Sequence, residues 1–429
     1  MDRLTLTGGL VVDPSSGSAA RADVFIADRR IAGLHPPGER PSVGEVVDVT
    51  GRVVAPGLVD IHVHLREPGQ THKETIASGT RAAVAGGFTT VCCMPNTDPP
   101  LDRPERVREV QEIIQRDAAC RVQVIGAISL DNDPDRPADA RALQAAGCVA
   151  LTDDAFPLPE QAQRRQALQA AAAAGLPFIA HCEDKSLSHG APLHEGEVSR
   201  RLGLVGQPDL AESVAAERWL QLHETGARLH LAHVSTARTV AALREAMPRW
   251  QGRLSAETAP HYFALTDAAV LRFGADAKMN PPLRSEADRQ AVAAAVRDGL
   301  LAVIATDHAP HAPAEKALGL ASAPFGVVGL ETALGVALTA LQGEMGLPEV
   351  LRRMTAGPAQ VLGLSAGRLA PGAAADVVII EPDAPWTVQP SRFLSQGWNT
   401  PFAGETLLGR VWGTIVDGAL LYLDGEYAE

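Results

Sequence analysis

Asp60-Ile61-His62-Val63-His64-Leu65-Arg66 places two histidines two residues apart inside an apolar run. In a β-strand, residues i and i+2 point to the same face. Two imidazoles on one face can hold a metal ion, whereas a buried pair without a metal must satisfy four ring nitrogens by hydrogen bonds alone. Taken by itself, the pattern is more often a pair of hydrogen-bonded core histidines than a metal site. Its meaning therefore depends on the rest of the chain.

The run that carries these histidines is the first of eight short apolar runs, at residues 59–65, 88–94, 121–128, 148–152, 177–181, 228–233, 253–257 and 301–306. Helical patterns lie between most of them, for example at residues 103–116, 160–174, 210–224 and 284–298. Strands that alternate with helices form a parallel sheet, and eight such repeats close into a barrel. The sequence therefore predicts an α/β fold built on a (β/α)₈ TIM barrel.

Both ends of the chain have a different pattern. They contain short strands separated by Gly, Pro and Ser, at residues 4–12, 22–26, 30–34 and 45–49, then 376–380, 411–416 and 419–423. Each end alone is too short to build its own core. We therefore predict one small β domain made of residues 1–55 and 366–429, beside a barrel of residues 56–365. Two separate β appendages are the alternative.

The composition is that of a soluble enzyme, with 46% hydrophobic and 21% charged residues in a chain of 429. A net charge of −13 argues against nucleic acid or a membrane surface as a partner. The five cysteines are odd in number and form no C-x-x-C pair, which indicates reduced thiols in the cytoplasm. The first residues lack the apolar core of a signal peptide, and no run approaches the roughly 18 apolar residues of a membrane span.

Residues that can bind a metal end five of the predicted strands. They are His62 and His64 on the first, Asp153 and Asp154 on the fourth, His181 on the fifth, His233 on the sixth and Asp307 on the eighth. Each one alone has an ordinary reading as a core histidine, a helix cap or a loop residue. In a TIM barrel, however, the carboxyl ends of the strands converge on one face. Imidazoles and carboxylates gathered there suit two zinc-like ions, which usually share a bridging carboxylate.

Longer motifs surround these residues, at positions 62–69, 72–75, 86–90, 94–97, 152–154, 181–183, 233–236, 278–284, 305–311, 324–326 and 399–402. The set spans nearly the whole chain and resembles dihydroorotases of the long bacterial type (class I), within the amidohydrolase superfamily. The resemblance implies a zinc-dependent cyclic amidohydrolase. Such an enzyme interconverts (S)-dihydroorotate and N-carbamoyl-L-aspartate, the third step of de novo pyrimidine biosynthesis.

The resemblance implies that one zinc ion is held by His62, His64 and Asp307, and a second by His181 and His233. Many relatives bridge the two ions with a carboxylated lysine on the fourth strand. This chain has no lysine between residues 73 and 185, so a carboxylate must take that place. The family pattern assigns the bridge to Asp154, whereas the spacing alone leaves Asp153 and Asp154 open.

The resemblance also implies roles in catalysis and substrate binding. Asp307 would first accept the proton of the attacking water and then pass it to the leaving nitrogen. The substrate carboxylate would be bound by Arg66, Asn96 and His311, because a guanidinium matches a carboxylate with two parallel hydrogen bonds. The rest of the substrate would contact His64, Asn280 and the backbone of Phe325 and Gly326. A surface ion pair between Arg66 and Glu67 is the alternative for that arginine.

Other functions compatible with the sequence are an allantoinase- or hydantoinase-like cyclic amidase, an inactive subunit that scaffolds aspartate transcarbamoylase, and a passive zinc-binding protein. Family members dimerise or join aspartate transcarbamoylase, and no residue run chooses between these states. Residues 311–325 are rich in Ala, Gly and Pro, and we expect them to form a mobile lid over the site.

Overall fold

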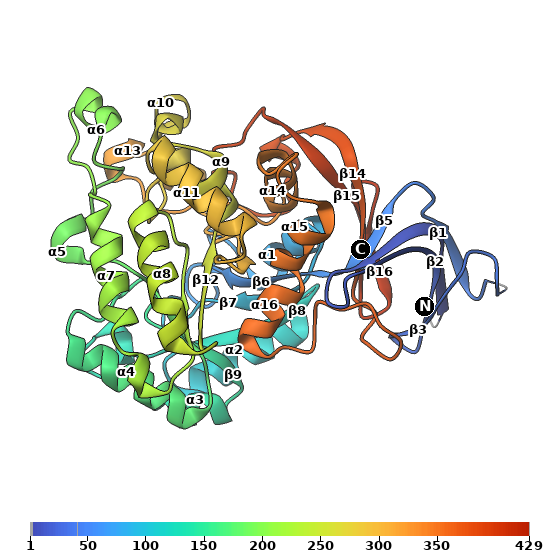
Figure 1. Cartoon of the computed structure of the whole chain (residues 1–429), viewed down its shortest axis with the longest axis horizontal. Helices are drawn as coiled ribbons and strands as arrows, with labels where there is room; N and C mark the ends of the chain where they lie inside the picture. Colours follow the sequence, from blue (N-terminus) through green and yellow to red (C-terminus); the bar gives the residue numbers. More distant parts are fainter. Residues whose placement is uncertain (1–2, 41, 429) are drawn as a thin grey trace.

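The computed structural model describes residues 3–40 and 42–428 and contains a helix-covered barrel beside a sheet of long strands (Figure 1). The barrel strands are β6 (Leu58–Val63), β7 (Phe88–Cys93), β8 (Arg121–Ala127), β9 (Cys148–Thr152), β10 (Phe178–Ala180), β11 (Leu229–Leu231), β12 (Leu254–Thr258) and β13 (Val303–Ile304). They pair in sequence order and in parallel. A hydrogen bond of 2.8 Å from His64 N to His308 O joins the last strand to the first. The predicted (β/α)₈ barrel is confirmed.

Helices connect the strands and cover the barrel. They are α1 (Ile76–Ala85), α2 (Pro104–Asp117), α3 (Ala140–Ala145), α4 (Gln161–Ala174), α5 (Lys185–Ser188), α6 (Glu197–Leu202), α7 (Leu210–Leu220), α8 (Ala237–Trp250), α9 (Pro260–Ala264), α10 (Val270–Phe273), α11 (Glu286–Arg297), α12 (Pro313–Lys316), α13 (Gly319–Ser322), α14 (Ala333–Ala340), α15 (Leu347–Met354) and α16 (Ala356–Leu362). Two of the longer helices, α8 and α11, are capped by hydroxyl side chains. Thr236 and Ser285 accept hydrogen bonds from backbone N–H groups of the first turn of these helices.

Both ends of the chain contribute to one sheet, at the right of Figure 1. Its strands are β1 (Arg3–Asp13), β2 (Ser18–Ala27), β3 (Arg30–His35), β4 (Glu45–Asp48), β5 (Val53–Pro56), β14 (Val377–Thr387), β15 (Thr406–Val416), β16 (Ala419–Leu423) and β17 (Glu426–Tyr427). The two ends meet where β14 pairs antiparallel with β5. The prediction of a small β unit from both termini is confirmed, whereas its boundaries at residues 55 and 365 stay a prediction.

This terminal sheet is buried on both faces at the start of β14, over residues 377–380. Val377 and Ile379 pack into the sheet's own core, while Val378 and Ile380 pack into the core that surrounds the barrel. The alternation follows from the two-residue repeat of a strand. The sheet is therefore fixed to the barrel by apolar contacts.

Strand β6 contains an irregularity that decides where the histidines point. Three steps along β6, from Asp60 to Val63, face only two steps along β7. Such an extra residue is a β-bulge, which re-aims the side chains that follow it. Val59 and Ile61 pack inside the barrel, whereas Val63, at the end of the bulge, packs outside it. His62 and the residue two positions later therefore turn inward, toward the other strand ends.

Among the described residues, no helix combines the length and the apolar character needed to cross a membrane. All five cysteines are buried and free.

Candidate active site

Histidines and aspartates from five barrel strands meet at the carboxyl ends of those strands. Asp307 Oδ1 lies 3.2 Å from His64 Nε2 and 3.5 Å from His62 Nε2. On the other side of the cluster, His181 Nδ1 lies 2.8 Å from His233 Nε2. Two overlapping groups can each hold a metal ion, His62 with Asp154 and His233, and His62 with His64 and Asp307. The structure thus brings together the residues that the sequence singled out as ligands.

Asp154 lies between the two halves of this cluster. Its Oδ1 is 3.2 Å from His181 Nδ1 and 3.9 Å from His62 Nε2, and its Oδ2 is 3.8 Å from His64 Nε2. Asp153 next to it is used differently, because its carboxylate accepts backbone hydrogen bonds from His181 N (2.9 Å) and Leu158 N (3.2 Å). Of the two adjacent aspartates, only Asp154 therefore directs its carboxylate at the imidazoles.

The donor atoms fit a metal centre. His62 Nε2 is buried and has no hydrogen-bond partner among the described residues, although a buried polar atom normally finds one. It points toward carboxylate oxygens of Asp154 and Asp307 at 3.9 and 3.5 Å. Neutral imidazole nitrogens combined with carboxylate oxygens are ligands that zinc and related divalent ions accept.

Glu257 on β12 was not found from the sequence. Its Oε1 lies 2.6 Å from His62 Nδ1, and its Oε2 lies 3.2 Å from His230 Nε2. A metal-binding histidine commonly donates its second N–H to such a carboxylate, which fixes the ring orientation. No motif drew attention to Glu257, and the only available signal was a carboxylate at the end of an apolar strand.

Glu183 plays the same part for another imidazole. Its Oε2 lies 3.1 Å from His181 Nε2 and accepts a hydrogen bond of 3.0 Å from Asn280 Nδ2. Its Oε1 accepts a hydrogen bond from Ser188 Oγ. The motif around His181 contains this glutamate, but no role was predicted for it from the sequence.

Three residues of the site have left-handed backbone conformations although none is glycine. The φ angles are 60° at Arg66, 34° at His233 and 49° at Asp307. Such conformations are unfavourable for L residues, and they concentrate where the surrounding structure enforces a functional geometry.

The cluster forms the floor of a cavity of about 460 Å³ whose wall includes Arg66, Asn96, Asn280, Phe325 and Gly326. Arg66 is 8% exposed, and burial lowers its pKa to about 10. Its Nε donates to Pro310 O at 3.2 Å. Among residues 3–40 and 42–428 it forms no ion pair, while Glu67 accepts a hydrogen bond from Ile76 N instead. The surface-pair alternative for Arg66 is therefore wrong.

The two asparagines on the cavity wall are held by their neighbours. Asn96 Oδ1 lies 2.8 Å from His64 Nδ1, and its Nδ2 donates to Asp154 Oδ2 at 3.3 Å. Asn280 donates to Glu183 and accepts from Gln207 Nε2 at 3.3 Å. Their amide orientations are thus fixed before any substrate arrives.

His311 lies behind the cavity wall in this structure. Its Nε2 is 2.7 Å from Phe325 O and 3.3 Å from Arg66 Nη2. The backbone of Gly326 is also engaged, because its N donates to Lys278 O and its O accepts from Asn399 Nδ2. Gly326 has a φ of 138°, and a Cβ there would come within 2.7 Å of Ala309. These contacts fix the wall that Phe325 and Gly326 form.

The segment 311–325 is attached by two of the chain's few lysines. Lys316 Nζ donates to Lys278 O, Pro324 O and Gly326 O at 3.3, 3.0 and 2.8 Å. Lys278 Nζ donates to Ala321 O at 3.1 Å. That the segment acts as a lid stays a prediction. Slower limited proteolysis within it when a ligand occupies the cavity would support the lid, and equal cleavage rates with and without ligand would contradict it.

The neighbouring imidazoles favour the ionised form of Asp307. Burial by itself would raise the pKa of its carboxyl, but the adjacent imidazoles of His62 and His64 outweigh burial and lower that pKa. The carboxylate is thus ionised at neutral pH and can accept a proton.

Comparison with known proteins agrees with this geometry. The family described as "Dihydro-orotase-like" matches residues 51–239. A protein named dihydroorotase from Pelotomaculum thermopropionicum is 47% identical over 427 residues, which cover 98% of this chain and 99% of that protein. The chain belongs to the dihydroorotase family. A second dihydroorotase, from Anaeromyxobacter dehalogenans, is 46% identical over 99% of both chains.

Solved structures share the fold of this dihydroorotase family member at lower identity. L-hydantoinase from Arthrobacter aurescens superposes with a TM-score of 0.89 at 24% identity and covers 100% of this chain and 98% of its own. Dihydropyrimidinase from Brevibacillus agri gives a TM-score of 0.87 at 22% identity, over 99% and 96%. These likenesses show the barrel and its terminal sheet.

Proposed function

We propose that this chain is an active dihydroorotase, which interconverts (S)-dihydroorotate plus water with N-carbamoyl-L-aspartate. Arg66 carries the proposal. A buried guanidinium without a carboxylate partner is costly unless a ligand supplies the negative charge. The Arg66 side chain lines the same cavity as the imidazole and aspartate cluster. The substrate bears a carboxylate that can pair with this guanidinium.

The proposal includes two zinc ions. His62, His64 and Asp307 would hold one ion, His181 and His233 the other, and Asp154 would bridge them. When bound, the ions polarise the scissile carbonyl and lower the pKa of the attacking water. Glu257 and Glu183 would keep the rings of His62 and His181 in orientation.

Asp307 would move the proton in both directions. In hydrolysis, its carboxylate accepts a proton from the attacking water and delivers it to the ring nitrogen as the bond between that nitrogen and the carbonyl carbon breaks. In ring closure the steps reverse: the carbamoyl nitrogen attacks the side-chain carboxyl carbon, and Asp307 accepts that nitrogen's proton as the carbon–nitrogen bond forms. Asp307 then delivers the proton to the carboxyl oxygen that is expelled, and a second proton from solvent completes the water molecule. One water molecule is consumed or released in each turnover.

Arg66 would orient the substrate through its carboxylate, with Asn96 beside it. Asn280 and the backbone of Phe325 and Gly326 would face the ring amides. His311, which lies behind Arg66, would act on the carboxylate only if its contact with Phe325 O opened. Fixing the ring in this way places the reacting carbonyl over the cluster, which accelerates the reaction by orientation.

The test measures how the zinc-loaded protein hydrolyses three cyclic amides, which are dihydroorotate, hydantoin and allantoin. Mass spectrometry follows the products. We expect kcat/KM for dihydroorotate to exceed the others by about 10²-fold or more, because only dihydroorotate pairs with the buried arginine. A preference for hydantoin or allantoin would favour the sibling amidase. Zinc binding without turnover of any substrate would favour an inactive scaffold.

The quaternary state and location belong to the same proposal. A cytoplasmic enzyme that forms a homodimer or joins aspartate transcarbamoylase would follow the family. Light scattering of the purified chain, alone and mixed with aspartate transcarbamoylase, separates these states by mass.

A further inference from the structure

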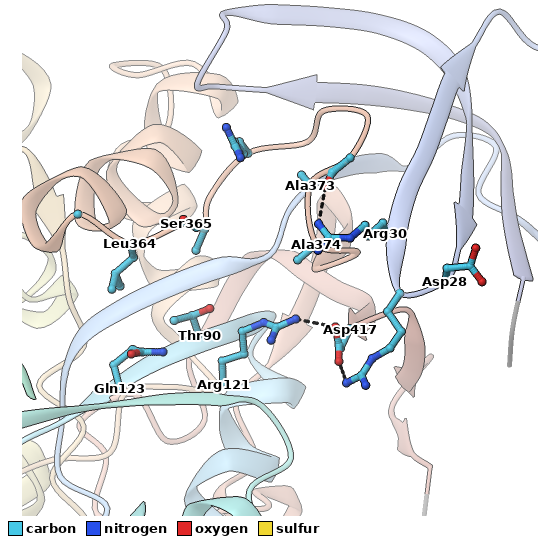
Figure 2. A pocket seen from close by; sticks show the side chains of 15 residues that line it. Asp28, Arg30, Thr90, Arg121, Gln123, Leu364, Ser365, Ala373, Ala374 and Asp417 are labelled. Carbon is cyan, nitrogen blue, oxygen red and sulfur yellow. Dashed lines mark hydrogen bonds and ion pairs between the residues drawn. The ribbon is translucent and has the colours of Figure 1, made fainter. Parts of the chain in front are cut away.

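A second cavity, of about 760 Å³, is lined by residues at the amino-terminal ends of barrel strands, opposite the end that carries the cluster. Figure 2 shows this cavity from close by. It is bounded by the first residues of β7 and β8, by the loop after α16 and by the turn between β2 and β3. It therefore sits where the amino-terminal mouth of the barrel meets the terminal sheet. None of its lining residues belongs to the active site described above.

The barrel contributes polar side chains to this cavity. Cys92 and Ile125 pack inside the barrel. Thr90 and Gln123 lie two positions before them on the same strands, so their side chains point to the same inner face. Thr90 is 2% exposed, and its hydroxyl has no hydrogen-bond partner among the described residues. A buried hydroxyl without a partner is destabilising. The mouth of the barrel thus carries an unused donor that faces the cavity.

Guanidinium groups complete the wall. Arg121 donates through Nη2 to Asp417 at 2.7 Å (Figure 2) and through Nε to Asp376 at 2.9 Å. Its Nη1 has no hydrogen-bond partner among the described residues. Arg30 donates Nη1 to Gly372 O at 2.7 Å. Within residues 3–40 and 42–428, neither Arg30 nor Arg368 pairs with a carboxylate. Arg29 and Arg121 both pair with Asp417, and Asp28 is the other carboxylate on the wall. The lining nevertheless has four arginines against two aspartates, although the whole chain carries a net charge of −13.

We propose that this cavity binds a small oxyanion ligand of the phosphomonoester class. Arg30, Arg121 and Arg368 would face its charged oxygens, and Thr90 and Gln123 would donate hydrogen bonds to the same oxyanion. Guanidinium and hydroxyl donors that surround a cavity select a ligand rich in acceptors. The volume falls within the range of about 300–1,000 Å³ typical of small-molecule sites. Since the wall comes from both the barrel and the terminal sheet, the ligand would also stabilise their contact.

The test measures binding to the full-length, zinc-loaded protein by calorimetry, with saturating N-carbamoyl-L-aspartate present to occupy the active site. The probes are inorganic phosphate, a nucleoside monophosphate and free aspartate. We expect saturable binding of the two phosphates and none of aspartate. Binding of aspartate alone, or no saturable binding at all, would overturn the proposal.

Two variants locate the binding. Thr90→Val removes the unpaired hydroxyl with almost no change of shape, and Arg368→Gln removes an unpaired charge. Each should weaken phosphate binding about tenfold or more, because a hydrogen bond to a charged group is lost, while turnover of dihydroorotate stays unchanged. Arg249→Gln, at an exposed arginine outside the cavity, is the matched control. If Thr90 serves packing only, Thr90→Val leaves phosphate affinity at the wild-type value, and that result would contradict the proposal.

Discussion

His62 Nδ1 lies 2.6 Å from Glu257 Oε1, and both side chains are almost completely buried. Burial would raise the pKa of Glu257, but His62 and His230 outweigh burial and hold that pKa well below its usual range. The ionised carboxylate accepts a hydrogen bond from Nδ1–H, so the Nε2 lone pair of the neutral ring faces Asp154 and Asp307. Glu257 therefore determines which nitrogen of His62 can bind a metal.

Glu257→Gln should weaken zinc binding by about 10–100-fold, the usual loss when such a supporting carboxylate is removed. The amide keeps the shape of the side chain but loses its negative charge. Competition with a chelator measures the zinc affinity without relying on turnover. Glu245→Gln, at an exposed glutamate, is the control, and an affinity equal to wild type in Glu257→Gln would refute the assigned role.

Asp154→Asn and Asp153→Asn form a matched pair of adjacent substitutions. We expect Asp154→Asn to bind fewer than two zinc ions per chain, because its carboxylate alone faces both pairs of imidazoles. Asp153→Asn should retain both ions and lower the melting temperature, since its carboxylate accepts backbone N–H groups. Elemental analysis after gel filtration gives the zinc count. The reverse pattern would assign the bridge to Asp153.

Arg66→Gln should reduce kcat/KM for dihydroorotate by about 10²-fold or more, because breaking a buried charge pair costs about 2–5 kcal/mol. Dihydrouracil has the same ring without the carboxylate, so its slow hydrolysis should change little. Steady-state kinetics on both substrates separate loss of recognition from general damage. Equal losses on the two substrates would mean that Arg66 supports the fold of the site and not carboxylate binding.

Glu331 gives a prediction about pH. Burial raises the pKa of its carboxyl to about 8, although N–H groups of Leu394 and Ser395 act in the opposite direction. The folded state therefore holds this proton more tightly than the unfolded state, whose pKa is near 4.5. The contribution of this proton to the free energy of unfolding is fully present below pH 4.5. It is lost as the pH rises toward 8, by up to about 1.4 kcal/mol per pH unit.

Glu331→Gln removes this titration. The difference in melting temperature, variant minus wild type, should therefore increase between pH 5.5 and pH 8. Scanning fluorimetry of both proteins in matched buffers measures it. A difference that stays constant over this range would show that Glu331 does not titrate there.

The sequence was sufficient for the barrel because eight apolar runs alternate with helical patterns, and both features depend on local residue order. It also identified the imidazoles and Asp307, since they end strands whose carboxyl ends must converge. It could not reveal the bulge in β6, because an extra residue in a strand depends on pairing with β7. The left-handed backbones of His233 and Asp307 are likewise imposed by tertiary contacts.

Glu257 and Glu183 escaped prediction for a related reason. The role of Glu257 depends on its meeting His62 across the barrel, 195 positions away in the sequence. Glu183 is only two positions from His181, but its role depends on the direction of its side chain. Similarly, the choice between Asp153 and Asp154 rests on the direction of two adjacent side chains. Residue types and spacing do not determine this direction. The contacts in the folded structure do, because Asp153 accepts backbone N–H groups and Asp154 faces imidazoles.

The central claim is that a zinc-bridged cluster hydrolyses dihydroorotate, and a zinc titration of the metal-free protein tests it most directly. Dihydroorotate hydrolysis and bound zinc are measured in the same samples as the metal is added. We predict that turnover rises with zinc and reaches its maximum at two ions per chain. Two tightly bound zinc ions without turnover of dihydroorotate would contradict the claim.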